Sequence, residues 1–201
     1  FNEINKLNEK TIYIITSDHG EEFYDHNDWK HGKTLYEEVI NIPLIISFSY
    51  KHAYISVNKY VESIDIAPTI LYLLNISIPE DFRGINLFNL INNKKEKDFV
   101  FSGGRWNRGT IIKDNLKYYR YRSEDENESD EDYSNNFFEE LYNISNDPYE
   151  RKNIILENPV IANKLRNNIN RIFAESMQKE AEHTTISKKT LEQLKLLGYI
   201  D

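Results

Sequence analysis

The chain has 201 residues, of which 39% are hydrophobic and 29% charged, and a formal net charge of −8 at pH 7. This length suffices for a buried core, and the composition is typical of a soluble globular protein. The excess of acidic residues argues against a nucleic-acid partner, which requires a basic face. No apolar run reaches the length of a membrane span. There is no cysteine, so disulfides and thiolate metal ligands are excluded, and the cellular compartment stays open.

The pattern of apolar and polar residues predicts two regions, residues 1–97 and residues 98–201. The first region reads as α/β. Its expected elements are strands near 11–16 and 43–48 and helices near 34–40 and 65–75. Both strands are nearly continuous apolar runs, which is typical of strands covered by helices on both faces. Asp65 and Pro68 are expected in the first turn of the last of these helices.

The second region has the pattern of a small antiparallel sheet. Aromatic and basic residues alternate over 116–121, and Asp114 and Asn115 form a two-residue turn just before them. Seven of the nine residues in 124–132 are acids, so their mutual repulsion predicts a solvated, flexible loop. A calcium-binding loop is the less favoured alternative, because the glycine and the spacing of an EF-hand are missing.

A long helix is predicted near the end of the chain. The aromatic residues that precede it, Tyr133, Phe137 and Phe138, are expected to return to the core. Asn158 and Pro159 offer a helix start. Apolar residues then recur every three or four positions, which predicts one apolar stripe that packs on the small sheet: Ile161, Leu165, Ile169, Ile172, Phe173 and Met177.

The strongest chemical signal is the pair Asp18 and His19, followed by Gly20, directly behind the first predicted strand. Open α/β sheets place their ligands at the carboxyl ends of strands. A carboxylate beside an imidazole suits a divalent metal ion. The alternative is a simple turn, because Asp and Gly commonly end strands.

The residues that follow form a polar loop rich in histidine. His19, His26 and His31, three of the five histidines of the chain, fall within thirteen residues. Glu21, Glu22 and Asp25 add ionisable groups, and predicted strands flank the loop on both sides. Such a loop on rigid flanks is typical of a functional site.

These motifs resemble, in order, those of the sulfatase family of the alkaline phosphatase superfamily. The resemblance covers Ser17 to Gly20, the His-rich loop, Leu35 to Glu38 and the strand 42–46. Further similar segments follow in the same order: 63–71, 83–87, 140–148 and 194–200. The resemblance implies an alkaline-phosphatase-like α/β sheet with flanking helices, present in part, plus a small antiparallel sheet and a closing C-terminal helix. Only the carboxyl-terminal half of such an enzyme is matched, with residues 1–97 as the last part of its catalytic domain.

The resemblance also implies roles for the site residues. Asp18 matches a metal ligand, and His19 stands where many sulfatases have Asn, so the metal is calcium, or manganese or zinc given the imidazole. His31 matches a position that contacts the sulfate or phosphate oxygens, with Lys33 as the alternative and Lys30 as a weaker one. His26 matches a histidine that is expected to be structural.

The nucleophile of the family is missing. Sulfatases take it from a Cys or Ser in a Cys/Ser-x-Pro-x-Arg motif, oxidised to formylglycine, in their amino-terminal half. In this chain Ser77 and Pro79 are followed by Asp81 where the motif has Arg, so formylglycine is not possible here. The chain, which opens on Phe1, is therefore expected to be a fragment, inactive alone, whose partner is the missing amino-terminal half or a separate chain.

The predicted function is that of a sulfatase-like, metal-dependent hydrolase acting on an anionic sulfate ester. Two alternatives stay open: a phosphodiesterase or phosphonate-ester hydrolase of the same superfamily, and a non-catalytic split or pseudo-enzyme that only associates with a partner. Arg105, Arg108 and Lys113 are further candidates for contacts with an anionic substrate. A solvated basic face is the alternative for these three residues.

Overall fold

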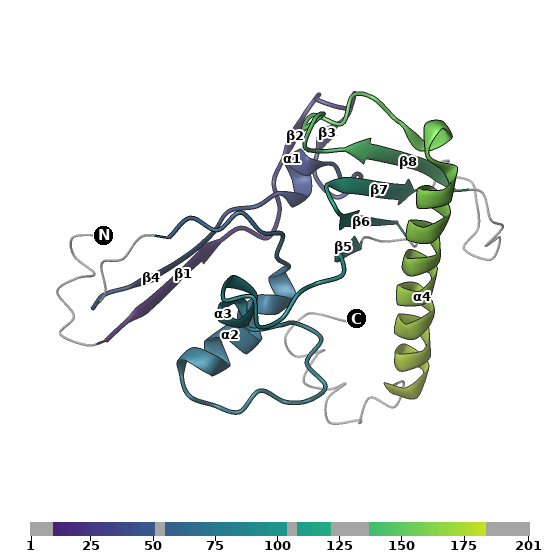
Figure 1. Ribbon diagram of the computed structural model, residues 1–201. Coiled ribbons are helices and arrows are strands. Elements are labelled where there is room, and N and C mark those ends of the chain that lie inside the picture. The colour runs from purple at the N-terminus through teal and green to yellow at the C-terminus, as the bar shows by residue number, and fades with distance from the viewer. Residues whose placement is uncertain (1–9, 51–54, 104–107, 122–136, 184–201) are drawn as a thin grey trace, which may run out of the picture. The chain divides into compact units, whose positions relative to one another are not determined.

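The computed structural model describes residues 10–50, 55–103, 108–121 and 137–183 (Figure 1). The chain divides into two compact units, residues 1–158 and 159–201, and the predicted boundary after residue 97 stays a prediction. In the first unit the elements are β1 (Ile12–Thr16), β2 (Glu22–Phe23), β3 (Trp29–Lys30), α1 (Glu37–Ile40), β4 (Leu44–Phe48), η2 (Ser63–Asp65), α2 (Ile66–Leu73), α3 (Leu87–Ile91), β5 (Val100–Gly103), β6 (Gly109–Lys113), β7 (Leu116–Tyr121), β8 (Phe138–Asn143) and η3 (Ile155–Glu157). In the second unit the described element is α4 (Pro159–His183).

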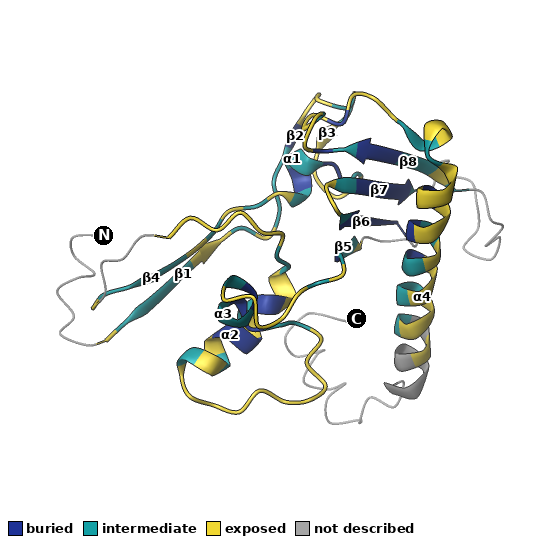
Figure 2. Cartoon of the chain, in the orientation of Figure 1, coloured by how far each residue is buried: buried dark blue, intermediate teal, exposed yellow. Residues whose placement is uncertain are grey.

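The two apolar strands of the first region pair with each other. β1 and β4 are antiparallel, with Ile12 opposite Phe48 and Thr16 opposite Leu44. The prediction that helices cover both faces of these strands is wrong for the described residues, because no residue of either strand is buried (Figure 2). Ile15 and Ile45, which pair with each other, are 40% and 53% exposed. Covering these apolar faces requires surface that this pair of strands does not itself supply.

Two predicted helices are present but shorter than expected. α1 has four residues and starts at Glu37, three residues after the predicted start. The second is a 3-10 turn, η2, that leads into α2. Asp65, fully buried at this junction, accepts hydrogen bonds from the backbone N–H of Glu62 (2.9 Å) and of Ile85 (2.8 Å). This aspartate therefore ties the start of α2 to the segment that precedes α3.

The small sheet has the order β5-β6-β7-β8 and is antiparallel throughout, as predicted. The turn between β6 and β7 has Asp114 at φ 51° and Asn115 at φ 62°, the two positive values that a type I′ hairpin requires. Ile111, Tyr118 and Leu141 are fully buried in this sheet. The expectation for Phe138 was wrong, because it starts β8 with 54% of its surface exposed.

Three charged side chains connect α1 to the small sheet. The ammonium group of Lys117, on β7, lies 2.8 Å from Glu150 Oε1 and 3.1 Å from Glu37 Oε1. The side chains of Lys117 and Glu150 are fully buried. The second oxygen of Glu150 accepts a hydrogen bond of 2.7 Å from the backbone N–H of Glu37, the first residue of α1. A charge taken out of water is tolerated only when it is paired in this way.

α4 starts at Pro159, at the predicted position, and Leu165 and Ile169 of its stripe are buried. Ile161 is 37% exposed, so the start of the stripe is less covered than predicted. Packing of this helix on the small sheet stays a prediction. The acidic segment 124–132 lies outside the described residues, as do Tyr133 and Arg105. Among the helices that the structure describes, none is both long and apolar enough to cross a membrane.

The first prediction concerns the buried charges. Replacing Lys117 by Met leaves the carboxylates of Glu37 and Glu150 without their cation, so we expect a loss of about 3–5 kcal/mol in the free energy of unfolding. Urea denaturation measures this loss. K152M is the matched control, because Lys152 is 71% exposed in its pair with Glu157, and we expect a change within about 1 kcal/mol. Equal midpoints for the two variants would contradict the role given to Lys117.

Candidate active site

The loop after β1 is pressed against α1, and Gly20 makes this approach possible. The backbone N–H of Gly20 donates a 2.7 Å hydrogen bond to Val39 O. A Cβ at position 20 would lie 2.0 Å from Glu38 O, far inside contact distance, so only glycine fits. The contact holds the end of β1 on the short helix and fixes where the preceding residues, Asp18 and His19, emerge.

Asp18 and His19 lie side by side at this position. His19 Nε2 is 3.7 Å from Asp18 Oδ2, and the two side chains are 38% and 87% exposed. The other ring nitrogen of His19, Nδ1, lies 2.7 Å from Gly20 O, which can only accept a hydrogen, so Nδ1 carries the proton. This leaves the lone pair of Nε2 available beside the carboxylate. A histidine oriented through its second nitrogen in this way is typical of metal ligands.

The carboxyl group of Asp18 is held in its charged form. Its own backbone N–H is the main cause that lowers the pKa of Asp18 below its ordinary value, followed by the neighbouring His19 ring. The backbone N–H of His19 donates to Asp18 Oδ1 at 3.0 Å. A carboxylate and an imidazole nitrogen thus fit a divalent cation in donor chemistry, and these two groups supply only part of a coordination sphere.

The histidine-rich loop brings His31 onto His19. The two rings are stacked, with their centroids 3.7 Å apart and an angle of 21° between their planes. His31 Nδ1 lies 3.3 Å from Glu21 Oε2, a partner that the sequence alone did not indicate. Lys33 Nζ is 3.1 Å from Asp28 Oδ1, within the same loop. The backbone N–H of Trp29 is the main cause that lowers the pKa of Asp28, and Lys33 adds to it.

A cavity of about 650 Å³ lies at this loop. All four residues predicted from the sequence contribute to its wall: Asp18, His19, His31 and Lys33. Arg108 also lines the cavity and is only 4% exposed. Its Nη1 donates a 3.1 Å hydrogen bond to the carbonyl of Gly32, the residue between His31 and Lys33. The cavity therefore combines one carboxylate with two imidazoles and two cationic side chains.

The other sequence candidates lie elsewhere. Lys30 does not belong to the described cavity wall. Lys113 lines a second cavity and pairs with Asp98. His26 is bound to Glu38, as described below. Sequence reasoning missed the cavity contributions of Ser63 and Ser102, because nothing in the chain marks these two serines apart from other serines.

The family model for the C-terminal part of N-sulphoglucosamine sulphohydrolase matches residues 25–179. The chain therefore belongs to the sulfatase family and corresponds to its C-terminal part. Arylsulfatase K of Homo sapiens is 27% identical over 181 residues, covering 83% of this chain and 32% of that protein. The chain spans between 18% and 32% of the length of the arylsulfatase K relatives that it matches in four mammals.

Solved structures show the same fold, in agreement with the fold class expected from the sequence. A protein in complex with its substrate D-glucosamine-2-N,6-O-disulfate is similar with a TM-score of 0.58 and 21% identity, over 91% of this chain and 37% of that one. The phosphonate monoester hydrolase of Agrobacterium radiobacter is similar with a TM-score of 0.54 and 18% identity, over 89% of this chain and 38% of that one. The expected family and its partial coverage are thus confirmed.

The second prediction concerns the contact of Gly20 with α1. In the variant Gly20→Ala the added methyl group collides with the backbone of Glu38, so we expect a loss of about 1–3 kcal/mol in the free energy of unfolding. G103A is the control, because a Cβ there meets only ring atoms of Phe101, which can move. Thermal unfolding of both variants measures the difference, and a loss in G103A as large as in G20A would contradict the assigned contact.

Proposed function

We propose that this chain supplies the carboxyl-terminal part of the active site of a metal-dependent sulfate-ester hydrolase. The observation that carries the proposal is the single cavity lined by Asp18, His19, His31 and Lys33. Asp18 and His19 would hold a divalent cation, through the carboxylate and Nε2. The metal would be calcium, or manganese or zinc given the imidazole of His19. Such a cation, when bound, polarises the ester as a Lewis acid.

His31 and Lys33 act on the anionic group of the substrate in this proposal. Each can donate hydrogen bonds to sulfuryl oxygens and offset the negative charge that develops on them and on the leaving oxygen. Arg108 supports them through its bond to Gly32 O and adds a second cationic side chain, beside Lys33, to the cavity wall. The family suggests a sulfated substrate, and the disulfated glucosamine bound by a structural neighbour supports a sulfated sugar.

The nucleophile belongs to polypeptide outside this chain, which contains no cysteine and no Ser-x-Pro-x-Arg motif. We propose that the amino-terminal part of the enzyme, in the same polypeptide or as a partner chain, provides it together with the remaining metal ligands. The exposed apolar side chains of β1, β4 and α2 offer a surface for that part, among them Ile15, Ile45, Ile70 and Tyr72. Large exposed apolar side chains of this kind, such as the paired Ile15 and Ile45, are typical of an interface.

The third prediction tests the metal. Two ligands leave most of the coordination sphere to water, so calorimetry with Mn²⁺ should give a weak dissociation constant, about 10⁻⁴ to 10⁻³ M. The variant D18N should bind at least about tenfold more weakly, because it loses the charged ligand. D98N is the matched control, since Asp98 is also an exposed carboxylate but lies outside the cavity wall. Equal affinities for D18N and D98N would contradict the site.

The fourth prediction tests the hydrolysis. The chain alone should give no turnover of 4-nitrophenyl sulfate, whereas the chain produced together with an amino-terminal sulfatase segment that carries formylglycine should give turnover. In that complex K33A and H31A should each lower kcat about 10²–10³-fold. K30A is the control and should retain activity, because Lys30 does not line the described cavity.

Three outcomes would contradict this prediction. Turnover by the chain alone would mean that it holds a nucleophile. An unchanged kcat in both K33A and H31A would remove their role. Faster cleavage of a phenylphosphonate ester than of the sulfate ester would favour the phosphonate hydrolase alternative, which the likeness to the enzyme of Agrobacterium radiobacter supports at the level of the fold.

A further inference from the structure

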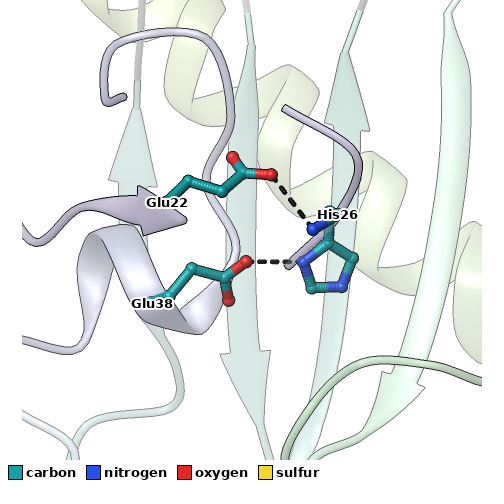
Figure 3. A group of neighbouring side chains, drawn as sticks. All are labelled: Glu22, His26 and Glu38. Carbon is teal, nitrogen blue, oxygen red and sulfur yellow. Dashed lines mark hydrogen bonds and ion pairs between the residues drawn. The ribbon is translucent and has the colours of Figure 1, made fainter. Parts of the chain in front are cut away.

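A second cluster of ionisable groups lies in the same loop, apart from the residues that line the cavity. It consists of Glu22 on β2, His26 in the loop that follows, and Glu38 on α1 (Figure 3). Glu22 is only 1% exposed, and the side chains of His26 and Glu38 are 11% and 19% exposed. Two carboxylates this poorly hydrated need a compensating positive charge or strong donors.

The contacts of the His26 ring indicate that this ring is the source of the positive charge that Glu22 and Glu38 require. Ring atom Nδ1 lies 2.5 Å from Glu38 Oε1, and Nε2 lies 3.3 Å from the backbone carbonyl of Glu150. A carbonyl oxygen only accepts hydrogen bonds, and so does an ionised carboxylate. Both contacts are therefore satisfied only when each ring nitrogen carries a hydrogen, which makes the ring a cation.

The remaining groups around the ring agree with a cation. The phenol ring of Tyr36 stacks on it, with centroids 3.6 Å apart and an interplanar angle of 11°, and an aromatic face stabilises a positive charge. Glu22 accepts a hydrogen bond from the backbone N–H of His26 through Oε1 (3.2 Å). The carboxylate of Glu150 itself is bound to Lys117. Among the described residues, the titratable groups in contact with His26 are Glu22, Glu38 and the phenol of Tyr36. The guanidinium of Arg151 is bound next to His26, to the carbonyl of Asp25 at 2.6 Å.

We propose that His26 is an imidazolium ion that positions the loop carrying His31 and Lys33. The cation links this loop to α1 through Glu38 and to the segment after β8 through the Glu150 carbonyl. Glu22 connects β2 to the far end of the loop, because its Oε2 accepts a 2.7 Å hydrogen bond from the hydroxyl of Thr34. His31 and Lys33 lie between these two anchored points. The contacts of the His26 ring with Glu38 and with the Glu150 carbonyl form a clamp on the loop. The clamp does not rest on the proposed function, whereas the roles of His31 and Lys33 do.

A divalent metal ion is the competing occupant of this cluster. One ligand atom from each of Glu22, His26 and Glu38 can lie within 4.8 Å of the others. A metal on Nδ1 would have to displace the hydrogen bond of that atom to Glu38. The direct bond and the second acceptor on Nε2 therefore favour the protonated ring.

The first test is a measurement on the unmodified chain. Two-bond ¹H–¹⁵N correlation spectra of its histidine rings at pH 7 separate a doubly protonated ring from either neutral tautomer. We expect His26 to show hydrogen on both nitrogens and to be unchanged by added ZnCl₂. A neutral tautomer would overturn the proposal. So would a zinc-dependent shift of the His26 ring, which would identify a metal site.

The second test separates positioning from packing. H26Q and H26K have side chains of similar length, but only Lys keeps a cation that can reach Glu38 and Glu150. The nuclear Overhauser contacts between the stacked rings of His19 and His31 report the position of the loop. We expect them to be lost in H26Q and retained, at least in part, in H26K. Equal loss in both, or retention in both, would overturn a role for the charge.

Titration with inorganic sulfate connects the clamp to the proposed function. We expect H26Q to lower the affinity of the chain for sulfate about tenfold, and H26K to lower it less. E157Q is the control, because it alters an exposed ion pair far along the chain from the loop. Absence of sulfate binding by the unmodified chain would count against the proposed anion site, whereas the ring spectra and ring contacts would still decide the clamp.

Discussion

The buried ammonium group of Lys117 is the interaction that fixes α1, the short helix on which the candidate site depends. It pairs with both Glu37 and Glu150, and Glu150 in turn accepts a hydrogen bond from the first N–H of α1. A helix of four residues without a side-chain cap of its own cannot persist in isolation. Burial raises the pKa of Glu150, and the nearby ammonium offsets part of that effect. Lys117 on β7 and Glu150 after β8 therefore hold the start of α1 in place.

Both halves of the site are attached to this short helix. Gly20 packs against its backbone and sets the exit of Asp18 and His19, whereas Glu38 holds the His26 ring of the loop that leads to His31. The small sheet also lines the cavity through Ser102 and Gly103 of β5, and Arg108, just before β6, adds to the wall. The cavity is thus built from both predicted regions, residues 1–97 and 98–201, and neither region alone encloses it.

Features that depend on neighbouring residues were predicted correctly from the sequence. The β6–β7 turn, the start of α4 and the grouping of Asp18 with His31 and Lys33 each depend on residues that lie close together along the chain. Two kinds of feature were not predicted from the sequence. The predicted helix cover of β1 and β4 is wrong for the described residues, because an apolar run shows that a strand can be buried but not which part of the structure buries it. The pairing of Lys117 with Glu37 and Glu150 joins residues far apart in sequence, and no local pattern signals it.

Asp18 and His19 forming one cation site is the central claim of this account. Anomalous scattering from manganese in crystals of the chain tests it most directly, because the peak locates the ion without reference to activity. We expect one peak within coordination distance of both the Asp18 carboxylate and His19 Nε2, in the cavity that His31 and Lys33 line. A peak at Glu22, His26 and Glu38 instead, with none beside Asp18, would contradict the account.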